Sequence, residues 1–390
     1  PLLMVAAWYL CNPPENVGLT YLFLWAIIFY TAYTIVKIPY WSWGAELSSD
    51  YEERSKITGF RESCSMLGNL MVASAPLLLL PKDAPVRDVL FLMALLIIIL
   101  IPITVIPLTV AIADRNPIVR VKFNFLQNFK ELMQNGPLLQ FLIAIFCIYI
   151  AVGVANSVAL FLIDIGLGLP NAFFTLFFIQ YVVATLAVLV VVKLANKLGK
   201  HIVLGIALLI LMCISIVGFL LPMGAFLAVC IINCFAGIAF ACLYILPPSL
   251  LADIVDYDTA VSGEERTGIY MAALNLTFKL GLALGVGIAY GFLGLVGFDP
   301  SATSHTTHDV LMIRIAGYGI TTMFVIPAII VLWKFPITKK VQQELRRKIE
   351  ADSVSTTQLN DKNDCILAHK LDNAMSKNSL SATTILPDNS

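Results

Sequence analysis

Charged residues are scarce in this sequence, and their scarcity excludes most soluble folds. Asp, Glu, Lys and Arg make up 13% of the 390 residues, which is about half of their share in soluble globular domains. Acidic and basic residues are equal in number, at 25 each, so no overall basic excess indicates nucleic acid as a partner. Hydrophobic residues make up 59% of the chain, and this composition predicts an integral, multi-pass membrane protein.

Sequence motifs for disulfide frameworks, metal binding, nucleotide binding and catalysis are missing as well. The eight cysteines are scattered without a CxxC pair, which favours packing roles over a disulfide or metal framework. His305 and His308 form an HxxH in an expected loop, but no further metal ligands lie near them. No phosphate-binding loop of the form GxxxxGK(S/T) occurs, which argues against a primary pump. No nucleophile–base pair appears among the apolar runs, so we expect neither an enzyme nor a bound cofactor.

Long apolar runs are abundant, and they define ten predicted helical spans. A helix needs about 20 mostly apolar residues to cross the hydrocarbon core of a membrane. The runs that meet or approach this length are 1–10, 18–47, 59–80, 89–112, 137–164, 172–195, 202–221, 225–252, 267–297 and 312–333. The first run resembles the second half of a helix, so we expect further chain before residue 1.

Lysine and arginine predict which side of the membrane each connection faces, because positive residues near span ends are retained in the cytoplasm. The connections on one side, which begin with 48–58 and end with the first part of the tail to residue 348, carry seventeen of them including their flanks. The connections on the other side carry only Lys82, Arg87 and Arg314. We therefore expect the first set of connections and the C-terminus to be cytoplasmic.

The longest interior connection, 113–136, divides the spans into two sets. Its apolar residues recur every three to four positions, as in an amphipathic helix at a membrane surface. The tail begins with a basic stretch suited to anionic membrane lipid. We expect an N-terminal bundle in 1–112, a cytoplasmic linker in 113–136, a C-terminal bundle in 137–336 and a largely disordered cytoplasmic tail in 337–390.

Two lysines, Lys37 and Lys279, lie inside apolar spans, where a charged side chain costs about 3 kcal/mol and usually lines a polar cavity. Asn275 precedes Lys279 by one helical turn, so both side chains occupy one helix face. The alternative for Lys279 is a carboxylate partner that simply holds two helices together. The glycines that follow form small-xxx-small pairs and predict close helix approach: Gly281, Gly285, Gly287 and Gly291.

Lys37 lies in the stretch IVKIPYWSW, with Tyr33 and Trp41 one turn to either side on the same face. This combination suits a sugar, whose hydroxyls form hydrogen bonds while its C–H face stacks on an aromatic ring. Pro39 frees a backbone carbonyl and bends a helix, which is more useful beside a cavity than at a membrane surface. The alternative is an interfacial aromatic belt with a lysine that extends to the headgroups.

Two charged segments at the predicted cytoplasmic side contain the same Glu-Glu-Arg sequence. AELSSDYEERSKITG contains Glu52, Glu53 and Arg54, and LLADIVDYDTAVSGEERTG contains Asp253, Asp256, Glu264, Glu265 and Arg266. Such a weak repeat is expected when two halves of a transporter are related by an axis along the membrane normal. We interpret these residues as candidates for salt bridges that close the cytoplasmic side between the bundles, with solvated loops as the alternative.

The stretches YTIVKIPYWSWGAELSSDYEERSKITGFRES and LLADIVDYDTAVSGEERTGIYMAALNLTFKLGLALGVGIAYGFLGLVGFDP resemble the glycoside-pentoside-hexuronide:cation symporters, the melibiose-carrier-like branch of the major facilitator superfamily. The similarity spans nearly all of residues 1–335. It implies an all-α major facilitator fold of twelve helices in two bundles, a central sugar site and coupling to sodium, lithium or protons. On this resemblance the chain begins at the third helix, and the family's sugar- and cation-binding aspartates would lie before residue 1.

Several residues match individual positions of that family. Trp41 matches its sugar-stacking tryptophan, and Arg61 matches its sugar-binding arginine. Tyr244 matches an aromatic position that faces the site, while Asn275 and Lys279 match polar positions of the eleventh helix. Together with Lys37, these residues form the predicted substrate-binding set.

Lys37 departs from the family pattern, because the sodium-using members have an aspartate before IP(F/Y)W. Reversing this charge should abolish sodium coordination, since hard cations need oxygen ligands. A lysine could instead neutralise an aspartate from helices before residue 1, which would make the carrier proton-coupled or uncoupled. It could also bind an anionic substrate such as a uronate.

We therefore expect a monomeric secondary transporter of a bacterial inner membrane that moves a sugar or glycoside by alternating access, with a proton or sodium ion as the coupling cation. One alternative keeps the fold but carries a lysolipid or a similar amphiphile, as eukaryotic relatives of this superfamily branch do. The other is a transporter-derived sensor that binds its ligand without moving it.

Overall fold

The computed structural model describes residues 1–46, 51–81, 84–111, 135–262, 267–300, 302, 304–333 and 335–336. Within these ranges the regular structure is entirely helical, without a strand. The helices are α1 (Leu2–Cys11), α2 (Leu19–Glu46), α3 (Tyr51–Leu79), α4 (Val86–Ala111), α6 (Gly136–Phe161), α7 (Phe173–Leu198), α8 (Lys200–Leu220), α9 (Phe226–Ser262), α10 (Thr267–Leu295), α11 (Thr307–Arg314) and α12 (Thr321–Trp333). Two π-helical turns, η1 (Leu162–Gly166) and η2 (Ile315–Ile320), extend α6 and join α11 to α12.

The predicted membrane spans correspond closely to these helices. Eight helical stretches of the described chain are long and apolar enough to cross a membrane. The predicted spans 1–10 and 59–80 contain shorter apolar helical stretches, Leu2–Cys11 and Leu67–Leu79. The all-helical, multi-pass membrane architecture is therefore confirmed.

Two local sequence features explain where helices α6 and α8 begin. Asn135 caps α6, because its side-chain oxygen accepts a hydrogen bond from the Leu138 backbone N–H at 3.0 Å. Gly199 has φ of 103° and separates α7 from α8. A residue with a side chain rarely adopts that backbone conformation, so glycine permits the sharp reversal between two adjacent spans.

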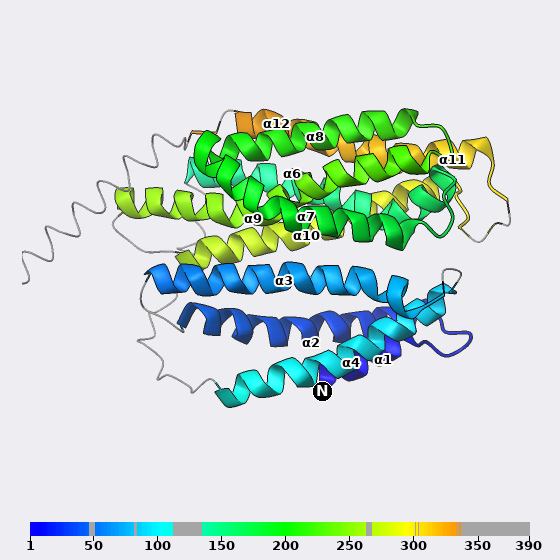
Figure 1. The fold of residues 1–390 in the computed structure, drawn as a ribbon, viewed down its shortest axis with the longest axis horizontal. Coiled ribbons are helices and arrows are strands. Elements are labelled where there is room, and N and C mark those ends of the chain that lie inside the picture. Colours follow the sequence, from blue (N-terminus) through cyan, green and yellow to red (C-terminus); the bar gives the residue numbers. More distant parts are fainter. Residues whose placement is uncertain are drawn as a thin grey trace, which may run out of the picture.

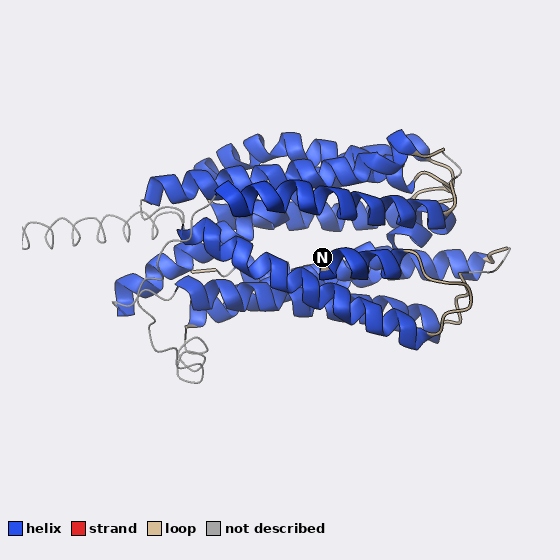
Figure 2. Ribbon diagram, turned by 90° about the horizontal axis from the view of Figure 1, so that it is seen from below, coloured by secondary structure: helices blue, strands red, loops and turns tan. Residues whose placement is uncertain are grey.

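The helices form two groups that lie side by side, and all run roughly along the long axis of the molecule (Figures 1 and 2). In the first group, α1 packs against α2 and α4. In the second group, α6 packs against α10 and α12, and α9 packs against α7 and α8. Helix α3 of the first group also packs against α7 of the second, so the boundary between the groups runs along these two helices. The linker predicted at 113–136 and the tail predicted at 337–390 fall almost wholly outside the described residues.

Glycines in α10 permit the close crossing of α10 over α6. A Cβ atom added to Gly281 would lie 2.8 Å from the Cβ atom of Tyr149, and one added to Gly153 would lie 2.6 Å from the carbonyl oxygen of Leu282. The first predicted glycine pair, Gly281 and Gly285, therefore does face a neighbouring helix. By contrast, a Cβ atom added to Gly287 would meet nothing within 4 Å in the described structure.

Candidate functional site

A hydrogen bond connects the two helix groups near the middle of their spans. The hydroxyl oxygens of Ser65 in α3 and Tyr244 in α9 lie 2.8 Å apart. Both residues lie near the midpoints of their helices. The predicted site residue Tyr244 is therefore located at the boundary between the groups, where a transported molecule would contact both.

Arg61 belongs to the same face of α3 as Ser65. The two residues are separated by four positions, which places their side chains one above the other on a helix. Since Ser65 reaches Tyr244, this face of α3 is directed toward the second group. The half-buried Arg61 lies about 6 Å further toward the start of α3, so the boundary contains a positive charge within one helical turn of the hydrogen bond.

Aromatic side chains of three helices surround the second-group side of this boundary. Tyr149 of α6 and Phe278 of α10 are stacked, with ring centroids 4.2 Å apart. Phe240 and Tyr244 of α9 are stacked at 6.3 Å, and Tyr149 lies close enough to Tyr244 to interact with it electrostatically. Of these residues, the sequence-based prediction included only Tyr244.

Lys279 follows Phe278 on α10 and is exposed. It makes no hydrogen bond, ion pair or ring contact within the described ranges. The side-chain amide of Asn275 donates a hydrogen bond of 2.9 Å to the carbonyl oxygen of Met271 in its own helix. Lys279 is thus a charge in the middle of a membrane span for which the described chain supplies no carboxylate partner.

Lys37 and Tyr33 share one face of α2, as the sequence predicts. The Lys37 Nζ atom lies 5.3 Å from the centroid of the Tyr33 ring, which is within the range of a cation–π contact. Lys37 is half-buried. The side chain of Trp41, predicted on the same face, lies outside the described residues.

Asp253 forms an ion pair inside the second group. Its Oδ1 atom lies 2.7 Å from Nζ of Lys200, and the Asp253 side chain is 5% exposed. Lys200 also donates a hydrogen bond of 3.0 Å to the carbonyl oxygen of Ser249. This pair connects the start of α8 to the end of α9, so it contributes to the stability of one group.

The segment around Asp253 was predicted as a connection, and this part of the prediction is wrong. Helix α9 continues to Ser262, because Ile254 and Val255 bury their side chains in the core of the second group. The predicted gating residue Asp256 is half-buried on this helical extension. The side chains of the other predicted gating residues lie outside the described ones: Glu52, Glu53, Arg54, Glu264, Glu265 and Arg266.

A polar cluster that the prediction missed lies at the same end of the second group. The side-chain amide of Asn135 donates hydrogen bonds to the hydroxyl of Tyr270 at 2.9 Å and to Oδ1 of Asp258 at 3.3 Å. Oδ2 of Asp258 is buried and has no hydrogen-bond partner within the described part of the chain. The cluster joins the starts of α6 and α10 to the end of α9.

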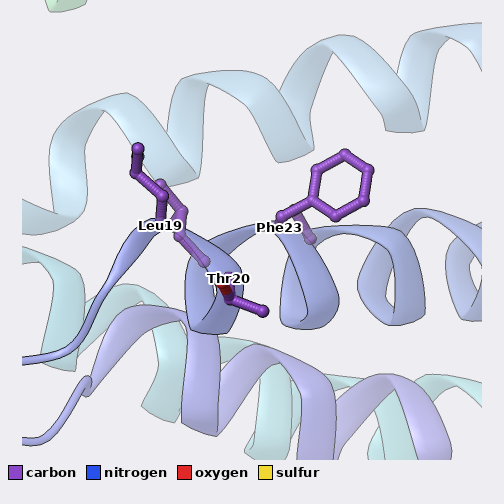
Figure 3. Close-up of a pocket in the computed structure, with 5 residues that line it drawn as sticks. Leu19, Thr20 and Phe23 are labelled. Carbon is purple, nitrogen blue, oxygen red and sulfur yellow. The ribbon is translucent and has the colours of Figure 1, made fainter.

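A separate apolar depression lies at the start of α2 (Figure 3). It is lined by Leu19, Thr20, Leu22, Phe23 and Ala26, all from one helix. These side chains supply no charge and a single hydroxyl, so they could not orient a polar substrate. The boundary between the groups, where Ser65 meets Tyr244, is the stronger candidate site.

Comparison with known proteins decides the family. Residues 1–339 match the family model described as MFS/sugar transport protein. The chain belongs to this family. Members of the family are membrane carriers without enzymatic activity, so the predictions of a major facilitator fold and of a transporter rather than an enzyme are confirmed.

The names of the relatives of this chain refer to chemically different substrates. An uncharacterized symporter from Synechocystis is 30% identical over 122 residues, which are 30% of this chain and 22% of that protein. A glucuronide carrier protein homolog from Escherichia coli is 23% identical over 362 residues, covering 89% of this chain and 78% of the relative. A sphingosine-1-phosphate transporter from Xenopus tropicalis is 22% identical over 371 residues, which cover 85% of this chain and 72% of the relative.

Proposed function

We propose that this MFS/sugar transport protein is a secondary transporter for an anionic glycoside, such as a uronate conjugate. The observation that carries the proposal is Lys279, a mid-span lysine without a partner in the described chain. A charge there costs about 3 kcal/mol, and a substrate carboxylate would offset that cost. Carboxylates of this kind occur in the ligands of the glucuronide carrier homolog named above.

The surroundings of Lys279 fit a sugar with a negative charge. Tyr149 and the residue before Lys279, Phe278, form a stacked aromatic pair, and the hydroxyls of Ser65 and Tyr244 supply hydrogen-bond donors and acceptors. Arg61 adds a second positive charge from the first group. A substrate bound here would contact both groups, which is the arrangement that alternating access requires.

Movement between the two faces of the membrane would break the Ser65–Tyr244 hydrogen bond, because these residues belong to different groups. We propose that rocking of the groups about this boundary exposes the site to each side in turn. We propose that the connections rich in lysine and arginine and the tail face the cytoplasm, as the positive-inside rule predicts, and that the membrane is a bacterial inner membrane. We also propose that Asp253, in addition to its ion pair with Lys200, and Asp256 help to close the cytoplasmic side between the groups.

Lys37 supports a proposal for the coupling ion. On the resemblance to the glycoside-pentoside-hexuronide symporters, its position corresponds to a carboxylate of the sodium-using members, and an ammonium cannot coordinate sodium. We therefore propose that the carrier is driven by protons, or by the gradient of its substrate alone, and not by sodium bound at this position.

A second candidate substrate is a phosphate-bearing lipid, because the chain is also similar to a sphingosine-1-phosphate transporter. Lys279 and Arg61 would attract a phosphate as readily as a carboxylate. A third candidate function is that of a sensor. It would bind its ligand as the two transporters do but would not move the ligand across the membrane.

Uptake into proteoliposomes containing the full chain tests these alternatives. Labelled phenyl glucuronide, the neutral phenyl glucoside and sphingosine 1-phosphate would each be supplied with an imposed proton or sodium gradient. The proposal predicts saturable uptake of the glucuronide in preference to the glucoside. Uptake of the lipid alone would contradict it, and saturable glucuronide binding without any flux would identify a sensor.

A further inference from the structure

A row of aromatic rings extends from one end of the second group to the candidate site. The row consists of Phe173, Phe177 and Tyr181 in α7 followed by Phe240 and Tyr244 in α9. Successive ring centroids lie 4.6, 5.8, 5.4 and 6.3 Å apart. These spacings are those of rings in contact, so the five side chains form one continuous aromatic surface, called the aromatic row below.

The aromatic row begins at one end of the second helix group and reaches about halfway along its helices. The starts of α7 and α9 lie at the same end of the molecule, because the Gly224 backbone N–H donates a hydrogen bond of 2.8 Å to the carbonyl oxygen of Leu167 in the neighbouring loop. From Phe173 to Tyr244 the row covers three turns, roughly 18 Å along the helix axes. It ends where Tyr244 meets Ser65 of the first group.

Packing of the helix interior accounts for these rings only in part, because Phe173 and Phe240 contact buried core residues but are not themselves fully buried. The buried positions of α7 are aliphatic: Leu176, Ala184, Ala187, Val191 and Ala195. All five side chains of the aromatic row remain half-exposed instead. Helix α7 packs against α3 across the boundary between the groups, and the Tyr244 end of the row lies at that boundary. The row is therefore a partly accessible surface beside the proposed transport route.

The chemistry of the aromatic row changes along its length. Phe173, Phe177 and Phe240 have no hydrogen-bonding group, so the hydroxyls of a bare sugar would lose their hydrogen bonds to water there. At the inner end, the hydroxyls of Tyr244 and Ser65 can bond to a polar group. Lys279 follows Phe278, whose ring stacks on Tyr149, in the sequence of α10. The aromatic row is thus apolar over most of its length and polar at its Tyr244 end.

We propose that the aromatic row is a second binding subsite, which holds the apolar aglycone of a conjugate whose charged sugar lies at Tyr244 and Lys279. The inference rests on the proposed transport of anionic glycosides and adds that recognition depends on the attached apolar group. A free uronic acid would occupy only the inner end, whereas a phenyl or alkyl glucuronide would contact both parts. The same apolar subsite would accept an aryl or an alkyl group, since ring faces contact either.

The test compares equilibrium binding and uptake of phenyl glucuronide and free glucuronate by the full chain. Phe177→Leu removes a ring from the middle of the aromatic row but keeps a side chain of similar volume. It should weaken phenyl glucuronide binding about 3- to 10-fold, the range expected for one aromatic contact, and leave glucuronate binding within about twofold. Phe178→Leu is the matched control, because Phe178 makes no ring contact within the described structure, and it should change neither ligand.

The outcomes separate this inference from the proposed function. Equal weakening of both ligands by Phe177→Leu would show that the ring only supports the fold, and it would overturn the aromatic row as a subsite. Equal affinity of the unaltered chain for both ligands, with transport of both, would overturn the subsite but support the proposed function. Selective phenyl glucuronide binding that Phe177→Leu abolishes, without uptake, would support the subsite and contradict transport.

Discussion

At the scale of single residues, charge inside the membrane spans was the strongest signal in the sequence. Lys37 and Lys279 are recognisable because each interrupts an apolar run, and the cation–π contact of Lys37 with Tyr33 follows directly from helical spacing. Tyr149 and Phe278 could not be selected in the same way. Aromatic residues are common in apolar spans, and only the crossing of α6 and α10 at Gly281 shows that these two stack.

We propose that Lys37 determines the coupling ion. Lys37→Asp restores the carboxylate that sodium-using symporters have at this position, so glucuronide uptake should become dependent on sodium. Uptake into proteoliposomes with and without a sodium gradient measures the effect. Lys37→Asn is the matched control, because an amide removes the ammonium without supplying a negative charge. Unchanged cation dependence in Lys37→Asp would exclude Lys37 from the cation position.

At the scale of helices, hydropathy predicted the spans well but predicted their ends poorly. The apolar run of α9 ends near residue 252, yet the helix continues to Ser262 because Ile254 and Val255 pack into the core. Such extensions depend on tertiary packing, and a count of apolar residues along the sequence carries no information about these contacts. Likewise, glycine spacing predicted a close crossing in α10 but could not show that Gly285 faces α6 and that Gly287 meets no neighbouring atom.

The two glycines of α10 provide a matched pair of substitutions. Gly285→Val places a branched side chain against the α6 backbone near Ile150 and Gly153, and overpacking of this kind costs about 1–3 kcal/mol. Gly287→Val places the same side chain where nothing lies within 4 Å in the described structure. Thermal unfolding in detergent should show a lower midpoint for Gly285→Val only. Equal midpoints would contradict the close crossing.

The ion pair between Lys200 of α8 and Asp253 of α9 should stabilise the second helix group. Asp253→Asn leaves the Lys200 ammonium without its carboxylate in a largely buried position, which should destabilise the protein by roughly 3 kcal/mol. Lys200→Met combined with Asp253→Leu removes both charges and should recover most of the loss. Unfolding midpoints of the two variants provide the comparison. If the pair served only to gate transport, both variants would change the transport rate but neither would lower the unfolding midpoint. That outcome would contradict a stabilising role.

At the scale of the whole molecule, the two helix groups meet along a boundary that contains the proposed site. The sequence predicted an all-helical major facilitator carrier, because hydropathy and the charge of the connections are properties of long segments. The Ser65–Tyr244 contact, where we propose the site, was not predictable from spacing, since these residues are far apart in the chain. Only the fold brings them together.

The positive charge of Lys279 gives the proposed site its most specific consequence. Lys279 has no partner in the described chain, and Arg61 lies on the α3 face that reaches the second group. A site with this charge should select anionic over neutral glycosides. Removal of the charge should therefore change which substrate is preferred and should leave the fold intact.

The most direct test is the ratio of phenyl glucuronide uptake to phenyl glucoside uptake in Lys279→Gln. Loss of a charge-assisted hydrogen bond of about 1.5–3 kcal/mol should lower this ratio roughly 10- to 100-fold. Lys279→Arg keeps the charge and should retain the preference for the glucuronide. An unchanged ratio in Lys279→Gln, with both substrates still transported, would contradict the account.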